Sequence, residues 1–268
     1  MSDPSSARPA PVRHAAPSDR FGKLVERRDG KDFPYYTGVP VGFTVQQWIL
    51  LWISVAVGFA ALVTLPQSTP LVALLPRILF VAIPLGTLAY LARDQWKALF
   101  RKVNGADVRT MIGFAVLNLV VTSILALIVK ALFGTAENPA VDGSDGWGAL
   151  DYVAFYAGTG IQLVGEELFT IIPFLALLYF LVTKGKLPRT TAIVLAWLIS
   201  AVWFGAAHLP TYDWNFAQAL IVIGGARLVL TLAYIRTKNL TVSIGAHIIN
   251  DWVLFTQSLF FSTALIAL

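Results

Sequence analysis

Long apolar runs, separated by short polar connections, make up the chain from residue 43 onward. A helix that crosses the ~30 Å hydrocarbon core of a bilayer needs about 20 apolar residues, and its backbone groups must be hydrogen-bonded within the segment. The pattern therefore predicts transmembrane α-helices. We expect seven crossings, at residues 43–65, 70–92, 110–133, 147–183, 191–208, 215–235 and 240–268.

The fourth run has more residues than one straight span requires. We expect a shallow or tilted extra helix near 148–160, ahead of the main crossing. The predicted fold class is thus all-α, a polytopic helical membrane protein with about seven transmembrane helices. We find no internal repeat, which argues against a transporter built from inverted halves.

Residues 1–42 differ from the rest of the chain, because they are rich in Pro, Ser, Arg and Asp and contain no apolar run. Such a segment cannot bury enough apolar surface to offset the entropy lost on ordering. We therefore expect a disordered cytoplasmic tail over 1–42 and a helical membrane domain over 43–268.

Charge alternates between the connections. The tail and the connections at 93–109, 184–189 and 236–238 are basic, whereas those at 134–147 and 209–214 carry acids and no Lys or Arg. The positive-inside rule then places the N-terminus in the cytoplasm and the C-terminus outside.

The composition sharpens the picture in two ways. With 57% hydrophobic and 13% charged residues, the chain suits membrane lipid as its solvent and partner, and topology accounts for the net charge of +5 without nucleic acid. The sequence contains no cysteine, which excludes a disulfide scaffold, a thiolate zinc site and a cysteine nucleophile.

Ionisable residues inside the spans are candidates for function, because each costs at least ~2.5 kcal/mol to insert. The most conspicuous are Glu166 and Glu167, adjacent in the fourth run. Neighbouring helical side chains point about 100° apart, so the two carboxylates should have separate roles. Glu166 shares a polar stripe with Gln162 and Thr170 and should face the interior. Glu167 could pair with Arg227 of the sixth run, although such a pair can also serve packing alone.

Two histidines follow in later spans. His208 comes four residues after Phe204, and His247 comes four residues before Asp251. Each histidine therefore shares a helix face with a companion, and Asn250 lies next to the second pair. Single histidines of this kind often make only structural hydrogen bonds. Together with the glutamates, however, two histidines can position and deprotonate water, directly or through a metal ion.

The order of these residues resembles that of the CAAX-protease and bacteriocin-processing family of intramembrane endopeptidases, also called abortive-infection-like proteins. That family carries the motifs EExxxR, FxxxH, and HxxxN or HxxxD on successive helices. Here they match EELFTI at 166–171, FGAAH at 204–208 and HIIND at 247–251. The sequence YIRTKNL at 234–240 is similar to the family's Tyr-x-Arg-Thr-Gly-Ser-Leu turn. The resemblance covers about residues 150–255 and implies a protease-like core there.

Two positions depart from the family pattern. The motif arginine falls on Ile171, so we infer that Arg227 supplies the guanidinium from another helix. Asp251 stands where Asn is commoner. Because an ionised Asp cannot donate to an oxyanion, Asp251 should orient His247 or be protonated, unless Asn250 takes the donor role.

The resemblance implies hydrolysis of a peptide bond in a membrane-associated or prenylated, CAAX-type substrate, in a bacterial plasma membrane. Glu166 would activate water with help from His208, while His247 and Asp251 would stabilise the oxyanion or orient the reacting groups. The catalytic residues would thus be Glu166, Glu167, His208, His247 and Asp251, and the residues of substrate or structural support would be Phe204, Asn250 and Arg227. We expect no cofactor, and zinc held by Glu166, His208 and His247 is the alternative mechanism. The alternative functions are a non-catalytic pseudoprotease scaffold and a carrier of small substrates.

Straight helices would keep the two histidines apart. At about 1.5 Å per residue, His247 lies only ~10 Å from the basic turn at 236–238. His208 lies a full span from the turn at 184–190. A shared site thus requires a sunken or re-entrant connection near 236–243, or a bend near His208.

Overall fold

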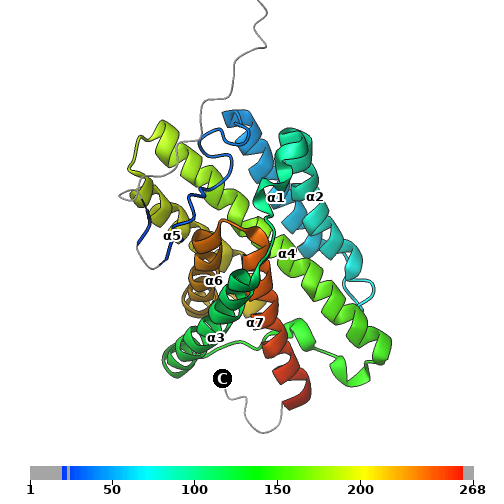
Figure 1. Cartoon of the computed structure of the whole chain (residues 1–268). Helices are drawn as coiled ribbons and strands as arrows, with labels where there is room; N and C mark the ends of the chain where they lie inside the picture. Colours follow the sequence, from blue (N-terminus) through cyan, green and yellow to red (C-terminus); the bar gives the residue numbers. More distant parts are fainter. Residues whose placement is uncertain (1–19, 23–24, 262–268) are drawn as a thin grey trace, which may run out of the picture.

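The computed structural model describes residues 20–22 and 25–261 (Figure 1). Within these residues the chain is helical and contains no β-strand, as predicted. The long helices are α1 Val45–Thr64, α2 Leu74–Ala92, α3 Gly105–Phe133, α4 Ala149–Tyr179, α5 Arg189–Ala207, α6 Gly224–Thr237 and α7 Leu240–Phe261. Short 3-10 and π-helical segments extend or join them, namely η3 Arg93–Leu99, η4 Pro139–Val141, η5 Ser144–Gly146, η6 Phe180–Lys184, η7 Pro210–Tyr212 and η8 Gln218–Ile223.

Six helical segments among the described residues are long and apolar enough to cross a membrane. They are Val45–Thr64, Leu74–Leu99, Gly105–Phe133, Ala149–Lys184, Arg189–Ala207 and Gln218–Thr237. The seventh predicted crossing is the helix α7, whose apolar sequence is interrupted by His247, Asn250 and Asp251. The last residues of that run, 262–268, lie outside the described part of the chain. The protein is thus a polytopic helical membrane protein.

One unbroken helix occupies most of the fourth run. α4 continues for 31 residues from Ala149, so the prediction of a separate extra helix near 148–160 is wrong. Aromatic contacts hold these first turns in the bundle, because the Phe155 ring lies 5.0 Å from that of Trp147 and 5.4 Å from that of Phe255 on α7.

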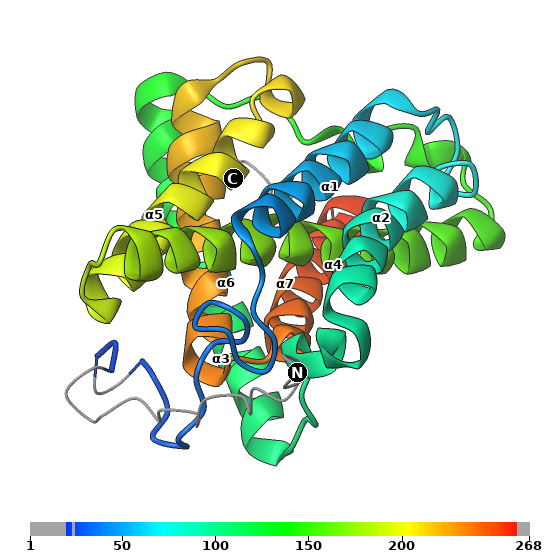
Figure 2. The same ribbon diagram turned by 90° about the horizontal axis from the view of Figure 1, so that it is seen from above.

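α4 is the centre of the bundle, and α1, α2, α5 and α7 all pack against it. Figures 1 and 2 show it crossing the whole molecule, with α1 and α2 on one side and α3, α6 and α7 on the other. In its apolar stretch 72% of the residues are buried, against 17% in α3. Polar side chains in the middle of α4 are therefore surrounded by other helices.

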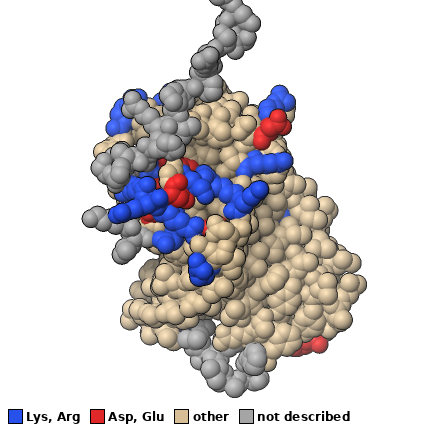
Figure 3. Space-filling view, in the orientation of Figure 1, with Lys and Arg blue, Asp and Glu red and all other residues tan. Residues whose placement is uncertain are grey.

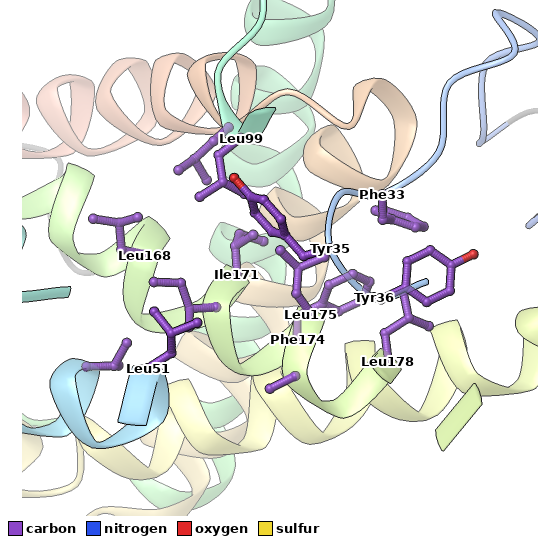
Figure 4. Packing of buried hydrophobic residues seen from close by; sticks show 14 of the residues in the cluster. Phe33, Tyr35, Tyr36, Leu51, Leu99, Leu168, Ile171, Phe174, Leu175 and Leu178 are labelled. Carbon is purple, nitrogen blue, oxygen red and sulfur yellow. The ribbon is translucent and has the colours of Figure 1, made fainter. Parts of the chain in front are cut away.

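The N-terminal segment packs on the bundle, so the prediction of a disordered tail over 1–42 is wrong for the described part of that tail. Its buried aromatic residues are Phe33, Tyr35 and Tyr36. Figure 4 shows their rings beside α4, where the centres of the Phe33 and Phe174 rings lie 5.4 Å apart. These residues are too few to form an apolar run, yet three rings close together in sequence bury enough surface to hold the segment. The remainder of the predicted tail lies outside the described residues.

Ion pairs fix the same segment to the ends of the helices. Both oxygens of Glu26 accept hydrogen bonds from the Arg189 guanidinium, at 2.7 and 3.0 Å. The Lys238 ammonium lies 2.8 Å from Glu26, and Asp32 lies 2.6 Å from Arg189. Burial by itself would raise the pKa of Glu26, but Arg189 and Lys238 outweigh it and lower this pKa to about 2. The segment therefore joins the start of α5 to the turn between α6 and α7.

Positive charge gathers on one part of the molecule. In Figure 3 the Lys and Arg side chains cluster near the N-terminal segment, and the opposite end of the visible face carries almost no charge. This one-sided distribution agrees with the predicted alternation of the connections. The assignment of the basic side to the cytoplasm stays a prediction.

We expect Glu26→Gln to lower the free energy of unfolding by about 3 kcal/mol, because it leaves Arg189 and Lys238 without their shared carboxylate. Thermal unfolding of the purified protein in detergent would measure the effect. Asp29→Asn, which alters an exposed acid of the same segment, is the matched control and should change little.

The stability difference should also depend on pH. The Glu26 pKa is lowered from 4.5 to about 2 in the folded protein, so its contribution is complete above pH 4.5 and is lost as the pH falls toward 2. The gap between wild type and Glu26→Gln should therefore narrow over this interval. A gap that stays constant would show that the carboxylate's charge is not what stabilises the segment.

Candidate active site

The two adjacent glutamates of α4 occupy different environments, as their angular offset predicts. Glu167 is completely buried, whereas the side chain of Glu166 is 12% exposed. Glu166 accepts a hydrogen bond of 2.9 Å from Gln162 one turn earlier. Thr170, which was expected in the same polar stripe, is buried and donates to the backbone carbonyl of Glu166 instead. Of the two carboxylates, only that of Glu166 is open.

Glu167 joins three helices. Its carboxylate lies 2.6 Å from the Arg227 guanidinium of α6, and both side chains are fully buried, so the predicted ion pair is confirmed. From α7, the Ser243 hydroxyl donates to the other oxygen of Glu167, and Nδ1 of His247 lies 3.0 Å from the oxygen that Arg227 contacts. The guanidinium thus comes from α6, and Ile171 is buried among apolar side chains (Figure 4).

His247 faces both glutamates and Asp251. While its Nδ1 is hydrogen-bonded to Glu167, its Nε2 lies 3.8 Å from Glu166 and 3.6 Å from Asp251. These two separations exceed the length of a direct hydrogen bond. Nε2 of His247 and the carboxylates of Glu166 and Asp251 therefore point toward one another without forming direct hydrogen bonds.

Asn250 lies behind Asp251. Its amide donates to the Asp251 carboxylate at 2.8 Å, and its carbonyl oxygen accepts from the Asn118 amide of α3 at 3.1 Å. Both asparagines are buried. Asn250 therefore holds Asp251 in place, as a supporting residue.

His208 is placed at the end of α5, and its Nδ1 lies 2.8 Å from the carbonyl oxygen of Phe204. The Phe204 ring centre lies 4.6 Å from that of His208 and 6.5 Å from that of His247. The Arg227 guanidinium stacks 5.1 Å from the same ring. Within the described part of the chain, His208 makes no direct hydrogen bond to Glu166 or His247. Phe204 thus connects the two histidines by packing.

Glu166, His208 and His247, the ligands of the zinc alternative, are not assembled as a metal site in the described residues. Among residues 20–22 and 25–261, no group of three or more His, Cys, Asp and Glu side chains is arranged to hold a metal ion. Glu166 and His247 face each other, but Nδ1 of His208 is directed at a backbone carbonyl. The residues present do not fit a three-ligand zinc centre in this arrangement.

The connection between α6 and α7 explains how His247 reaches the glutamates. Lys238 and Asn239 in this turn are buried, and Asn239 exchanges hydrogen bonds with the backbone of Arg101 at 3.0 and 3.1 Å. The turn is therefore covered by protein, and the sunken connection near 236–243 stays a prediction as to its depth in the membrane.

Several polar residues near the cluster were not predicted from the sequence. Ser243 precedes His247 by one turn, and Asn118 interrupts an apolar run, so both carried a weak signal. Tyr212 of η7 carried none, and it is buried near the site. Burial, and then the carboxylates of Asp251 and Glu166, raise the pKa of its phenol.

Arg77 of α2 also lies beside this cluster. Its guanidinium lies within electrostatic range of Glu166 and crosses α4 at Gly158, where any Cβ would come within 2.5 Å of Nη1. Its Nε and Nη1 are buried and have no hydrogen-bond partner among the described residues. Nothing in the sequence links Arg77 to the motifs of the later helices.

The comparisons with known proteins agree with this arrangement. Residues 146–253 match the family model described as type II CAAX prenyl endopeptidase Rce1-like. The matched segment runs from just before α4 into α7, so it contains both glutamates, both histidines, Arg227 and Asp251. No curated protein and no solved structure matches the chain. Over residues 146–253, the chain is thus similar to the Rce1-like type II CAAX prenyl endopeptidases.

Proposed function

We propose that this protein is an intramembrane endopeptidase that hydrolyses a peptide bond of a prenylated or membrane-associated substrate, with water activated by Glu166. The match of residues 146–253 to the Rce1-like family model supports CAAX-type proteolysis. The observation that carries the finer proposal is the convergence of Glu166, His247 and Asp251 on one point, with Nε2 of His247 3.8 and 3.6 Å from the two carboxylates.

Glu166 is suited to the role of general base because it is the open carboxylate of the pair. It takes a proton from water, and the resulting hydroxide attacks the scissile carbonyl carbon. The tetrahedral intermediate then collapses, and Glu166 returns the proton to the leaving amine. The products are a carboxylic acid and an amine, so one water is consumed for each bond broken. The Gln162 amide, 2.9 Å away, orients the carboxylate.

His247 is suited to bind the oxyanion. Its Nδ1 is held by Glu167 at 3.0 Å, and this hydrogen bond fixes the plane of the ring. In its protonated form, His247 presents Nε2–H to the developing negative charge. Asp251 lies 3.6 Å from the same nitrogen and acts as a positioning residue, because an ionised carboxylate cannot donate to the oxyanion.

His208 assists from the end of α5. If its Nδ1–H donates to the Phe204 carbonyl at 2.8 Å, Nε2 is left as an acceptor. As an acceptor, this nitrogen would help to hold the attacking water. Phe204 supports this role by packing between the two histidines and Arg227.

We expect Glu166→Gln to reduce cleavage at least about 100-fold while the protein still folds, because the amide keeps the shape and loses the basic oxygen. Cleavage of a farnesylated CAAX peptide by the protein in liposomes would measure this. Glu137→Gln, in an exposed connection, is the control and should keep wild-type activity. Cleavage that persists in Glu166→Gln would contradict the proposal. Absence of cleavage by the folded wild-type protein would also contradict it, and would favour a pseudoprotease or a carrier.

The buried ion pair should be tested by a double substitution. Arg227→Met leaves the Glu167 carboxylate without compensation and should lower the free energy of unfolding by about 3–5 kcal/mol. Combining it with Glu167→Gln should restore most of the stability, as thermal unfolding would show. Cleavage should stay well below wild type, because an amide is a weaker acceptor for His247 than a carboxylate. A double variant with wild-type activity would show that the pair serves packing alone.

The metal-free mechanism makes a separate prediction. We expect cleavage by the purified protein to survive prolonged treatment with a strong zinc chelator, because Glu166 needs no metal to take a proton from water. The control is a known zinc protease treated in parallel. Loss of activity that returns on adding zinc would overturn the glutamate mechanism and favour the three-ligand alternative.

A further inference from the structure

One buried cation beside the candidate active site has no direct partner among the described residues. Arg77 of α2 is only 9% exposed, and its Nε and Nη1 make no hydrogen bond within the described part of the chain. No described carboxylate forms an ion pair with it. A buried charge is unfavourable unless something compensates it. The guanidinium is therefore suited to receive an anion.

Arg77 lies in the first turn of α2, which packs against α4. The guanidinium reaches α4 at Gly158, where a Cβ would come within 2.5 Å of Nη1, so only glycine leaves room for it. The first turn of α2 contains no acidic residue, and the N-terminus of a helix adds partial positive charge. Positive charge thus acts on the surface of α4 at Gly158.

A polar row on α4 leads from Arg77 to the candidate base. Gly158, Gln162 and Glu166 are spaced by four residues and therefore lie along one ridge of the helix. Gln162 and Glu166 are both half-buried, and the Gln162 amide donates to the Glu166 carboxylate at 2.9 Å. Arg77 and Glu166 are close enough to interact electrostatically, but they form no ion pair. The row therefore connects the unpaired guanidinium with the open carboxylate.

The length of this row corresponds to a short peptide. Gly158 and Glu166 are eight residues apart, which is about 12 Å along the helix. The hydrogen bond from Gln162 shows that the Glu166 carboxylate is directed toward the N-terminus of α4, so its gap to the guanidinium is somewhat shorter. Each residue of an extended chain spans about 3.3–3.6 Å. About three residues therefore fit between a peptide bond at Glu166 and a carboxylate at Arg77.

We propose that Arg77 binds the C-terminal carboxylate of the peptide substrate and so directs Glu166 to a bond about three residues from the end of that substrate. A guanidinium can donate two parallel hydrogen bonds to one carboxylate, and an uncharged chain end cannot replace that pair. This role rests on the proposed proteolysis and makes Arg77 a specificity-determining residue for it. Arg77 lies outside residues 146–253, so the family match does not assign the role.

The test uses three farnesylated peptides of one sequence. The first ends in a free carboxylate three residues after the scissile bond, the second is the C-terminal amide of the first, and the third continues for three more residues. Cleavage at the same bond by the full-length protein in liposomes is followed by mass spectrometry. We expect kcat/KM for the first peptide to exceed that for the other two at least about tenfold, mainly through KM, because only the first places a carboxylate at Arg77.

Substitutions of Arg77 should remove this preference. In Arg77→Gln the ratio of kcat/KM for the free acid to that for the amide should fall close to one. Arg77→Lys keeps the charge and loses the paired donors, so it should retain part of the preference. Arg93→Gln removes an exposed arginine just after the other end of α2 and is the matched control, which should keep the wild-type ratio.

Gly158→Ala tests the position of the guanidinium without removing its charge. The new Cβ would clash with Nη1 and displace it, so the ratio for acid over amide should fall several-fold. Gly160→Ala adds the same methyl group two residues further on, where it meets the Trp252 ring at 3.3 Å instead of Arg77, and the ratio should stay at the wild-type value. Thermal unfolding in detergent would verify that each variant folds.

The possible failures differ from one another. Equal cleavage of the acid and the amide by the wild-type protein would overturn the role of Arg77 and leave the proteolysis standing, and this comparison needs no variant to fold. Equal slowing of both peptides in Arg77→Gln would also overturn it, because the arginine would then act on Glu166 alone. Cleavage of none of the peptides by folded wild type would contradict the proposed function, and the role of Arg77 with it.

Discussion

The buried ion pair between Glu167 and Arg227 is the interaction on which the site depends. A carboxylate with no exposed surface in the middle of a membrane protein would cost several kcal/mol without a partner. The guanidinium at 2.6 Å provides that partner, and it comes from a different helix. Ser243 and His247 then use the remaining acceptor positions of the same carboxylate. One charge thus fixes α4, α6 and α7 relative to one another.

This arrangement explains why two adjacent glutamates are present. Glu167 is saturated by its three partners, so it has no free oxygen to offer a substrate. Glu166 is rotated about 100° from it around the helix, has one hydrogen-bond partner and stays partly open. Both face the same imidazole, one at Nδ1 and the other toward Nε2. The position of the Glu167–Arg227 pair therefore fixes the His247 ring, and the ring in turn sets where Nε2 lies relative to Glu166.

The sequence predicted features that follow from the free-energy cost of placing particular residues in a membrane. The helices follow from apolar length, and the Glu167–Arg227 pair follows from the need to compensate charge. The sequence could not predict contacts that depend on which helices become neighbours. The hydrogen bond from Asn118 to Asn250 and the approach of Tyr212 to the carboxylates are of this kind. The prediction for the N-terminal segment was wrong because its three aromatic residues stand in a polar sequence and form no apolar run. They are buried only through contacts with other elements, such as that of Phe33 with Phe174 of α4.

Because its arginine is on α6, this site connects different helices from those that the family motif would connect. An arginine at position 171 would lie one turn from Glu167 on the same helix and would tie α4 only to itself. Ile171 instead fills the apolar core, and the charge comes from Arg227, whose guanidinium also stacks on Phe204 of α5. The compensating charge therefore couples α4, α5 and α6. Any displacement of α6 must move Glu167, and through it the His247 ring that faces Glu166.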